Sequence, residues 1–425
     1  MPRILLLATT TGYQTRAFGE AAERLGVELV FATDRCAVLE DPWRDGAVPI
    51  RFHQEAESVE AILRANGRRP LDGVLVVGDR PTVIAARVLQ RLGLPGHPPE
   101  AVAAARNKLA SRERLRAGGL PVPWFAVTPV DADVGTVAAS LPYPCVLKPL
   151  ALSGSRGVMR VDDAAGFRAA FDRLRALLQA PDIRGERDEI HRMALVESFV
   201  PGREFAVEGI LHHGALQVVA VFDKPDPLDG PFFEETIYVT PTSFPQSTER
   251  AIVAAVARAA RAIGLRHGPV HAECRVNAEG VHVLEVAARP IGGLCARALR
   301  VVADGGKSPA VAYEELLLRH ALGEPLAGWA REPMAAGVMM IPIPRRGVLR
   351  GVEGDAEARA VPGIEDVRIT AKPDQVLVPL PEGASYLGFI FGRGPSPGEV
   401  EHALRRAHAR LRFAIDPEVQ VLRST

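Results

Sequence analysis

The sequence lacks the features that mark nucleic-acid-binding, membrane and secreted proteins. Its 51 basic residues match 51 acidic ones, so the formal net charge is zero and there is no basic footprint for nucleic acid. No apolar run approaches the ~20 residues that span a bilayer. The first apolar run, residues 4–8, is also too short for the core of a signal peptide. We therefore expect a cytoplasmic protein with no nucleic acid and no membrane among its partners.

Cysteine is scarce as well, with four residues in 425. Cys36, Cys145, Cys274 and Cys295 are scattered and form no Cys-x-x-Cys pair, which argues against a zinc site. Three of the four lie within apolar runs, a position typical of buried free thiols. We therefore expect a reduced protein whose cysteines pack in the interior.

A chain of this length is expected to form two to four domains. Residues 1–97 show strand and helix patterns in alternation, which predicts a Rossmann-like α/β unit with a parallel sheet. The expected strands are 4–8, 27–32 and 74–77, and the expected helices are 16–25, 58–65 and 81–92. The turn at residues 9–12 lacks a Gly-x-Gly-x-x-Gly pattern, so ordinary turn chemistry is expected there.

Pro98 and Pro99 mark the next boundary, and three further units are expected after it. Residues 98–193 should form a small subdomain, with helices at 100–117 and 166–179, strands at 124–128, 145–148 and 158–161, and a polar loop at 181–193. Residues 194–328 should form a larger subdomain, with strands at 194–200, 205–211 and 217–222, a helix at 249–263, a hairpin, and helices around 294–303 and 309–321. Residues 329–425 should form a separate α+β cap, with strands at 338–343, 367–369, 375–378 and 386–391 and a helix at 396–412.

The hairpin within residues 271–293 is the most informative segment, because each of its two β-prone runs carries a carboxylate. With a three-residue loop at 278–280, Glu273 faces Glu285 with Cβ atoms ~5 Å apart. Two like charges at that distance repel by ~3 kcal/mol at an effective dielectric near 20. The pair therefore favours a bound cation, and Mg²⁺ takes one or two carboxylates together with substrate phosphates.

Two alternatives to a metal clamp stay open for this hairpin. The acids could simply be ion-paired to Arg275, which shares their face of the strand. A two-residue loop would shift the register by one position and spoil the pairing of Glu273 with Glu285.

Further along the chain, other patterns are typical of phosphate and nucleoside binding. Lys148 closes an apolar strand pattern, and the loop 153–157 (Ser-Gly-Ser-Arg-Gly) follows at once. Such a loop offers backbone N–H groups to phosphate oxygens, although a flexible turn is the commoner explanation for one such loop alone. Glu197 and Glu204 flank a Pro-Gly turn. They are either exposed strand-end acids or, beside a nucleotide, acceptors for an adenine amino group and ribose hydroxyls.

Taken in order, these motifs resemble the ATP-grasp superfamily. The motifs are Lys108 in Asn-Lys-Leu-Ala-Ser, Lys148 with its loop, Glu197 with Glu204, and Glu273 with Glu285 and Arg289. The Arg-Pro-Ile-Gly-Gly run at 289–293 looks like that of carboxylate–amine ligases, the branch that includes bacterial L-amino-acid (dipeptide) ligases. The resemblance covers residues 1–325 well and the C-terminal part less closely. It implies an ATP-grasp fold with an N-terminal pre-ATP-grasp domain and a C-terminal α+β cap.

The resemblance implies ATP and Mg²⁺ (or Mn²⁺) as cofactors and assigns residue roles. Nucleotide binding would fall to Lys108, Lys148, the loop residues Ser153, Gly154, Ser155, Arg156 and Gly157, the adenine contacts Glu197, Phe199 and Val200, and the ribose contact Glu204. Metal binding would fall to Glu273 and Glu285. Catalysis would fall to Arg289, which stabilises the acyl-phosphate and the tetrahedral intermediate, and to Lys224, which reaches the γ-phosphate. Substrate contacts would fall to Gly292, Gly293, Glu234 and Glu235.

One position departs from the family pattern. Many members carry an asparagine two residues after the second metal-binding acid, whereas this chain has Ala287 there. The change removes a ligand for a second, tightly held Mg²⁺. No general base for the amine can be identified. His267 and His271 are candidates by position, but a histidine on a strand is more often a packed or solvated residue.

The function that the resemblance implies is an ATP-dependent carboxylate–amine ligase. Such an enzyme phosphorylates a small-molecule carboxylate, lets an amine attack the acyl-phosphate, and releases an amide or peptide with ADP and phosphate. Amino acids are among the expected substrates, and the family alone suggests a homodimer. Two alternatives stay open: an enzyme that activates bicarbonate or formate, of the carboxylase or purine-pathway type, and a nucleotide-binding module without catalysis.

Overall fold

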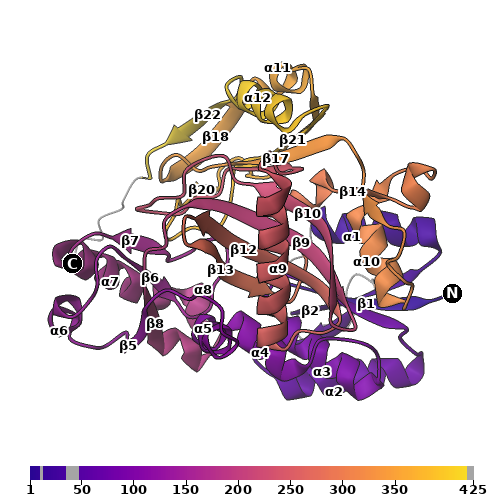
Figure 1. Cartoon of the computed structure of the whole chain (residues 1–425), viewed down its shortest axis with the longest axis horizontal. Helices are drawn as coiled ribbons and strands as arrows, with labels where there is room; N and C mark the ends of the chain where they lie inside the picture. The colour runs from indigo at the N-terminus through magenta and orange to yellow at the C-terminus, as the bar shows by residue number, and fades with distance from the viewer. Residues whose placement is uncertain (10–12, 35–46, 419–425) are drawn as a thin grey trace.

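Five β-sheets and the helices between them make up the described part of the chain, residues 1–9, 13–34 and 47–418 of the computed structural model (Figure 1). Most of the predicted turn at 9–12, and Cys36, lie outside these residues. The other three cysteines are buried free thiols, as predicted. None of the helices in the described ranges combines the length and the apolar character needed to cross a membrane.

The N-terminal unit is a parallel four-stranded sheet in the order β3-β2-β1-β4, which confirms the predicted α/β unit. Its strands are β1 (Arg3–Ala8), β2 (Glu28–Asp34), β3 (Val48–Ile50) and β4 (Gly73–Val77), and its helices are α1 (Tyr13–Leu25), α2 (Glu55–Arg68) and α3 (Thr82–Leu92). After Arg3, strand β1 is apolar because both of its faces are covered. Leu6 belongs to a core shared with α1, and Leu5 to a core shared with α2 and α3.

The predicted helix 100–117 is in fact two helices, α4 (Pro99–Arg106) and α5 (Lys108–Ala117). Asn107 between them has an extended backbone, and its side-chain oxygen accepts hydrogen bonds from the N–H groups of Leu109 and Ala110. Asparagine at this position caps a new helix start, so the prediction of one continuous helix was wrong. The break places Lys108 at the beginning of α5.

A small antiparallel sheet follows, in the order β5-β8-β6-β7. Its elements are β5 (Phe125–Pro129), β6 (Cys145–Pro149), β7 (Met159–Val161) and β8 (Met193–Ser198), with α6 (Val134–Ala139) and α7 (Ala164–Leu178) packed against them. The segment 181–193 is not the predicted loop. It forms the short helix α8 (Pro181–Arg184) and a 3-10 turn at Glu189–Arg192 before β8 begins.

The central sheet has eight strands in the order β13-β12-β9-β10-β11-β17-β21-β19. They are β9 (Arg203–His212), β10 (Ala215–Asp223), β11 (Ile237–Thr240), β12 (Gly268–Asn277), β13 (Gly280–Ala287), β17 (Ala335–Ile341), β19 (Ile364–Ile369) and β21 (Gly388–Gly394). Helix α9 (Gln246–Ile263) lies across one face (Figure 1), where its residues Ile252, Val256 and Ile263 share a core with β9 and β12. The apolar periodicity of the predicted helix 249–263 is confirmed.

Strands on both sides of the predicted boundary at 328 belong to this one sheet, because β11 pairs with β17. The C-terminal region adds a separate sheet of β18 (Gly347–Glu353), β20 (Val376–Leu377) and β22 (Arg412–Asp416), with helices α11 (Asp355–Arg359) and α12 (Pro397–His408). The predicted helix 396–412 therefore ends early, and its last residue, Arg412, begins β22. The division of the chain into four domains at 97, 193 and 328 stays a prediction.

The segment between the hairpin and β17 also differs from the expectation. The predicted helix around 294–303 is a 3-10 turn, Cys295–Ala298, followed by β14 (Arg300–Val302). Strand β14 pairs with β15 (Val311–Ala312) and β16 (Ala330–Arg331). The second expected helix, 309–321, is confirmed from residue 313 onward as α10 (Tyr313–Ala321), which packs against α1 and β4 of the N-terminal unit.

Candidate active site

A cavity of about 620 Å³ lies where the N-terminal unit, the small sheet, the central sheet and the C-terminal region meet. Most of the predicted site residues line it: Lys108, Lys148, Ser153, Gly154, Ser155, Glu197, Phe199, Val200, Glu204, Glu235, Glu273, Glu285, Arg289, Gly292 and Gly293. Four predicted residues, all in the described part of the chain, lie outside the lining: Arg156, Gly157, Lys224 and Glu234. The fold thus gathers motifs that lie far apart in the sequence around one space.

The two predicted metal acids face each other across the hairpin of β12 and β13. Glu273 and Glu285 are direct strand partners. The loop, however, has two residues, since Asn277 pairs with Gly280, and the predicted three-residue loop was wrong. A β-bulge corrects the register, because Cys274 pairs with Val283 while Glu273 pairs with Glu285. The extra residue on β13 thus offsets the missing residue in the loop.

Arg275 does not neutralise this acid pair. Its Nε donates to Glu204 at 2.9 Å, and another of its guanidinium nitrogens donates to the carbonyl of Val200 at 2.8 Å. Glu285 has a longer contact, 3.7 Å, with the ammonium of Lys108. The alternative in which Arg275 pairs with the two acids is therefore wrong.

Lys224 is buried behind the cavity wall among three carboxylates. Its ammonium lies 2.8 Å from Glu204 and 3.1 Å from Glu273, and it also contacts Glu235. Despite burial, these charges hold the pKa of Lys224 well above its usual value. Burial raises the pKa of Glu235 to about 7, whereas the pKa of Glu273 is lowered, against its burial, by Lys224 and His271. Lys224 is therefore a fixed cation beside one of the predicted metal acids.

Glu197 and Lys148 meet a third residue that the sequence analysis missed. Arg112 of α5 is fully buried, and its Nε donates to Glu197 at 2.6 Å, while Lys148 forms an ion pair with the other carboxylate oxygen. The signal for Arg112 was its position three residues before the buried Leu115, which puts a charge on the apolar face of the helix. Because both carboxylate oxygens are engaged, the adenine contact of Glu197 stays a prediction.

The substitution Glu197→Gln is expected to destabilise the fold by about 3–5 kcal/mol, because it leaves two buried cations without a counter-charge. Burial alone would raise the pKa of Glu197, but the charges of Arg112 and Lys148 lower it to about 2 from an ordinary 4.5. A carboxylate whose pKa is lower in the folded state stabilises the fold fully above pH ~4.5. That contribution to stability is lost as the pH falls toward 2. Urea unfolding at several pH values should show this acid-dependent loss in the wild type and not in the variant.

The matched control for this prediction is Glu279→Gln, at an exposed residue of the hairpin turn. It makes the same chemical change without removing a buried charge. If Glu197→Gln unfolded at the same urea concentration as the control, the ion pairs with Arg112 and Lys148 would not be what stabilises this site.

The loop 153–157 is divided between the cavity and the C-terminal region. Ser153, Gly154 and Ser155 line the cavity, whereas Arg156 and Gly157 turn away from it. The N–H of Gly157 donates to the carbonyl of Pro381 at 2.8 Å, and Arg156 Nε donates to the carbonyl of Glu382 at 2.8 Å. The nucleotide contacts of Arg156 and Gly157 therefore stay predictions. Their polar groups tie the loop to a segment that follows β20.

Arg289 has a partner from the N-terminal unit. Two of its guanidinium nitrogens donate to the two carboxylate oxygens of Asp79, at 2.9 and 3.1 Å. Asp79 follows β4 at the carboxyl end of the parallel sheet, where ligand-binding residues of such sheets collect. That position was the available signal for this missed residue. Burial opposes both charges, yet the pair raises the pKa of Arg289 and lowers that of Asp79.

His271 of β12 lines the cavity and is held by hydrogen bonding to β9. His271 Nδ1 lies 3.0 Å from Glu208, whose other oxygen accepts the N–H of Ile291 at 3.0 Å, beside the predicted substrate residues Gly292 and Gly293. Although burial opposes it, Glu208 raises the pKa of His271 to about 9. A pKa raised in this way favours the protonated, hydrogen-bonded ring, which agrees with the expectation of a packed residue. His267 lies outside the cavity lining.

The two adjacent glutamates predicted for the amine pocket point in different directions. Glu235 lines the cavity and contacts Lys224, whereas Glu234 is turned toward the backbone of Ile343. The assignment of Glu234 to the amine pocket stays a prediction.

Comparison with known proteins agrees with this architecture. The ATP-grasp N-terminal domain matches residues 19–96, the ATP-grasp domain matches residues 141–298, and the L-amino acid ligase C-terminal domain 2 matches residues 339–416. The chain belongs to the ATP-grasp superfamily. Its fold, an ATP-grasp core between an ATP-grasp N-terminal domain and a C-terminal domain, is the one predicted.

Individual relatives point to one branch of that superfamily. The crystal structure of L-amino acid ligase from Bacillus licheniformis aligns with a TM-score of 0.81 and 26% identity, over 98% of this chain and 99% of that one. The y4rH protein of Sinorhizobium fredii, which is uncharacterized and indicates no branch, is 27% identical over 98% of this chain and 84% of its own length. Carnosine synthase 1 of Gallus gallus is 33% identical, over 58% of this chain but only 27% of its own length.

Proposed function

We propose that this protein joins the carboxylate of one amino acid to the amine of a second amino acid. The protein is an ATP-dependent carboxylate–amine ligase, the class of its ATP-grasp relatives. The observation that carries the proposal is one cavity in which a paired set of acids, Glu273 and Glu285, lies with Arg289 and the 153–155 loop. A C-terminal region of the L-amino acid ligase type completes that cavity, which favours amino acids as both substrates.

The residues around the acid pair fit a bound magnesium ion and a nucleotide. Glu273 and Glu285 supply carboxylate oxygens, the donors that Mg²⁺ prefers, on neighbouring strands that line the cavity. Lys108, Lys148 and the backbone of the 153–155 loop face the same space and would hold the phosphates. When bound, Mg²⁺ would neutralise charge on the phosphate oxygens during transfer. Binding of a single ion is the proposal, since Ala287 supplies no further ligand.

The reaction must convert a poor acyl donor into a good one. A carboxylate oxygen attacks the γ-phosphorus of ATP, so that ADP leaves and an acyl-phosphate forms. The second amino acid attacks the acyl carbon through its neutral amine, phosphate leaves, and the amine proton is released. Arg289, held in place by Asp79, would offset the negative charge that builds on the acyl oxygen and phosphate.

Water has to be excluded while the acyl-phosphate exists. The C-terminal segment that binds Arg156 and Gly157 also contributes Ser385 and Tyr386 to the cavity wall. Arg173 adds an ion pair with Glu382 of that segment. This segment and the 153–157 loop are therefore connected and would close together.

Addition of ATP with Mg²⁺ is expected to slow amide hydrogen exchange in the 153–157 loop and in residues 381–386 together, because phosphate contacts would order the loop and its hydrogen bonds would order the segment. Exchange measured by mass spectrometry on peptides from both regions tests this. Peptides from the buried strand β9 are the internal control. Unchanged exchange in the loop would contradict the proposed closure, and a change in the loop alone would contradict its coupling to the segment.

The function itself is tested by a phosphate-release screen of paired amino acids with ATP and Mg²⁺, read by mass spectrometry for a dehydrated adduct. The expected result is release of ADP and phosphate that depends on both amino acids. Turnover that requires bicarbonate instead would assign the protein to the carboxylase-like alternative. Tight ATP binding with no phosphate release from any acid and amine pair would overturn the ligase proposal in favour of a binding module.

A further inference from the structure

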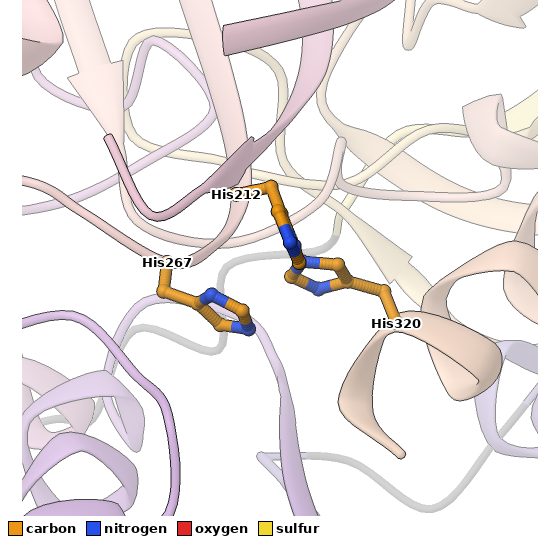
Figure 2. Close-up of side chains that lie close together, drawn as sticks. All are labelled: His212, His267 and His320. Carbon is orange, nitrogen blue, oxygen red and sulfur yellow. The ribbon is translucent and has the colours of Figure 1, made fainter. Parts of the chain in front are cut away.

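Three histidines from separate parts of the chain meet at the end of the central sheet. His212 is the last residue of β9, His267 directly precedes β12, and His320 lies in the last turn of α10. Figure 2 shows their rings pointing toward one another from a strand, a loop and a helix. One ring nitrogen from each lies within 4.8 Å of the others. His267 and His320 are buried and His212 is half-buried.

None of the three histidines lines the cavity described above. The cavity-lining residue nearest to them along the chain is His271 of β12, which follows His267 by four residues, or ~13 Å at ~3.3 Å per residue. The cluster is therefore a site separate from the cavity. It sits instead where α10, which packs on the N-terminal unit, meets the far end of the central sheet.

One pair of nitrogens, also within hydrogen-bond distance of each other, has the spacing of two ligands on one metal ion. His212 Nδ1 and His320 Nε2 are 3.3 Å apart. Two imidazole nitrogens on one tetrahedral zinc ion, each ~2.0–2.1 Å from the metal, are separated by ~3.3–3.4 Å. The rings of His267 and His320 stack at 4.3 Å with an angle of 22° between their planes. Binding of one metal ion by both would require a turn of one ring about its soft terminal torsion.

A second observation also points to a ligand. Only 7% of the surface of His267 is exposed, and its Nδ1 has no hydrogen-bond partner among the described residues. A buried polar nitrogen without a partner is costly and calls for an explanation. The backbone that carries this ring is itself held by His97, whose Nδ1 accepts the N–H groups of Arg266 and His267 at 3.1 and 3.2 Å.

We propose that His212, His267 and His320 form a binding site for a divalent transition metal of the zinc class, with a water molecule as the fourth ligand. The metal would link α10 to the ends of β9 and β12 and so stabilise the junction between the N-terminal unit and the central sheet. The scattered cysteines had argued against a zinc site. Three histidines that lie far apart in the sequence gave no spacing pattern from which this site could be read.

The test uses the full chain, freed of metal with a chelator and titrated with Zn²⁺ or Co²⁺ in excess Mg²⁺, which competes at the carboxylates of the cavity. We expect one equivalent of Co²⁺ to produce the intense visible absorption of a low-coordinate imidazole site. We expect Zn²⁺ to displace that absorption and to raise the thermal unfolding midpoint. Absence of a visible band, or a band that is removed by excess Mg²⁺, would overturn the proposal.

His267→Gln and His320→Gln identify the ligands, and His402→Gln, at an exposed position of α12, is the matched control. Loss of a partner that merely orients a ligand costs 10–100-fold in metal affinity, so loss of a ligand should weaken Zn²⁺ binding by more than ~100-fold. The control should bind Zn²⁺ like the wild type. ATP-dependent phosphate release in all three variants reports that the fold is intact. Equal Zn²⁺ affinity in either ligand variant and the control would overturn the assignment.

Discussion

Glu285→Gln is expected to lower ATP turnover by more than ~100-fold while leaving the fold intact. The substitution removes the charge of one of the two opposed acids but keeps the size of the side chain, and Glu285 is a third exposed. Loss of an outer partner of a metal ligand already costs 10–100-fold, and a direct ligand should cost more. The measurement is phosphate release as a function of Mg²⁺ and of Mn²⁺, with unfolding by urea as the check on stability.

Two comparisons make this result specific to the acid pair. Glu279→Gln changes an exposed glutamate in the same hairpin and should leave turnover unchanged. Glu273→Gln should also abolish turnover, but it removes a carboxylate from the Lys224 cluster and should therefore destabilise the fold as well. Normal turnover in Glu285→Gln, at any concentration of Mg²⁺, would remove this residue from the proposed metal site.

Arg289→Ala is expected to lower turnover by about 10³-fold, equivalent to about 4 kcal/mol of transition-state stabilisation, with a much smaller effect on ATP affinity. The guanidinium is proposed to act on charge that develops during transfer and acyl attack rather than on the nucleotide already bound. Single-turnover phosphate release and ATP titration, measured separately, distinguish these two effects. If ATP affinity fell as much as turnover did, Arg289 would be a nucleotide-binding residue instead.

The pair with Asp79 supplies the controls for this prediction. Arg289→Lys keeps the charge but loses the two-pronged geometry, so its turnover should fall between those of the wild type and Arg289→Ala. Asp79→Asn keeps Arg289 and removes only the charge that orients it. We expect a smaller loss in Asp79→Asn than in Arg289→Ala. Equal losses in the two variants would mean that Asp79 itself contacts the reacting groups.

Much of the fold could be predicted because it follows from local patterns. The parallel N-terminal sheet is visible in the buried run of β1, and α9 is visible in its apolar spacing. Elements that depend on a single polar residue were harder to predict. Asn107 ends one helix and caps the next, yet its neighbours favour a continuous helix. Tertiary pairing also overrides local preference, since the last residue of the predicted helix 396–412, Arg412, pairs with β18 as part of β22.

In the candidate site, too, local patterns could be predicted and long-range contacts could not. Glu273 and Glu285 were correctly paired, but only because the bulge in β13 offset an error in the loop length. Residues whose importance comes from a distant partner were missed. Asp79 and Arg112 form ion pairs with residues 210 and 85 positions away, and no local spacing encodes such contacts. The roles of individual nucleotide-binding residues remain predictions that the proposed variants can test.

The pairing of β11 with β17 has a consequence for anyone who wishes to dissect or recombine this enzyme. All four residues of β11 and all seven of β17 are buried. A fragment ending near residue 328 would lack β17 and would therefore expose β11 as an apolar edge strand without a hydrogen-bonding partner on that side. Such a fragment should self-associate rather than behave as an autonomous nucleotide-binding module. Grafting a different C-terminal region to alter substrate choice would have to replace β17, β19 and β21 as one block.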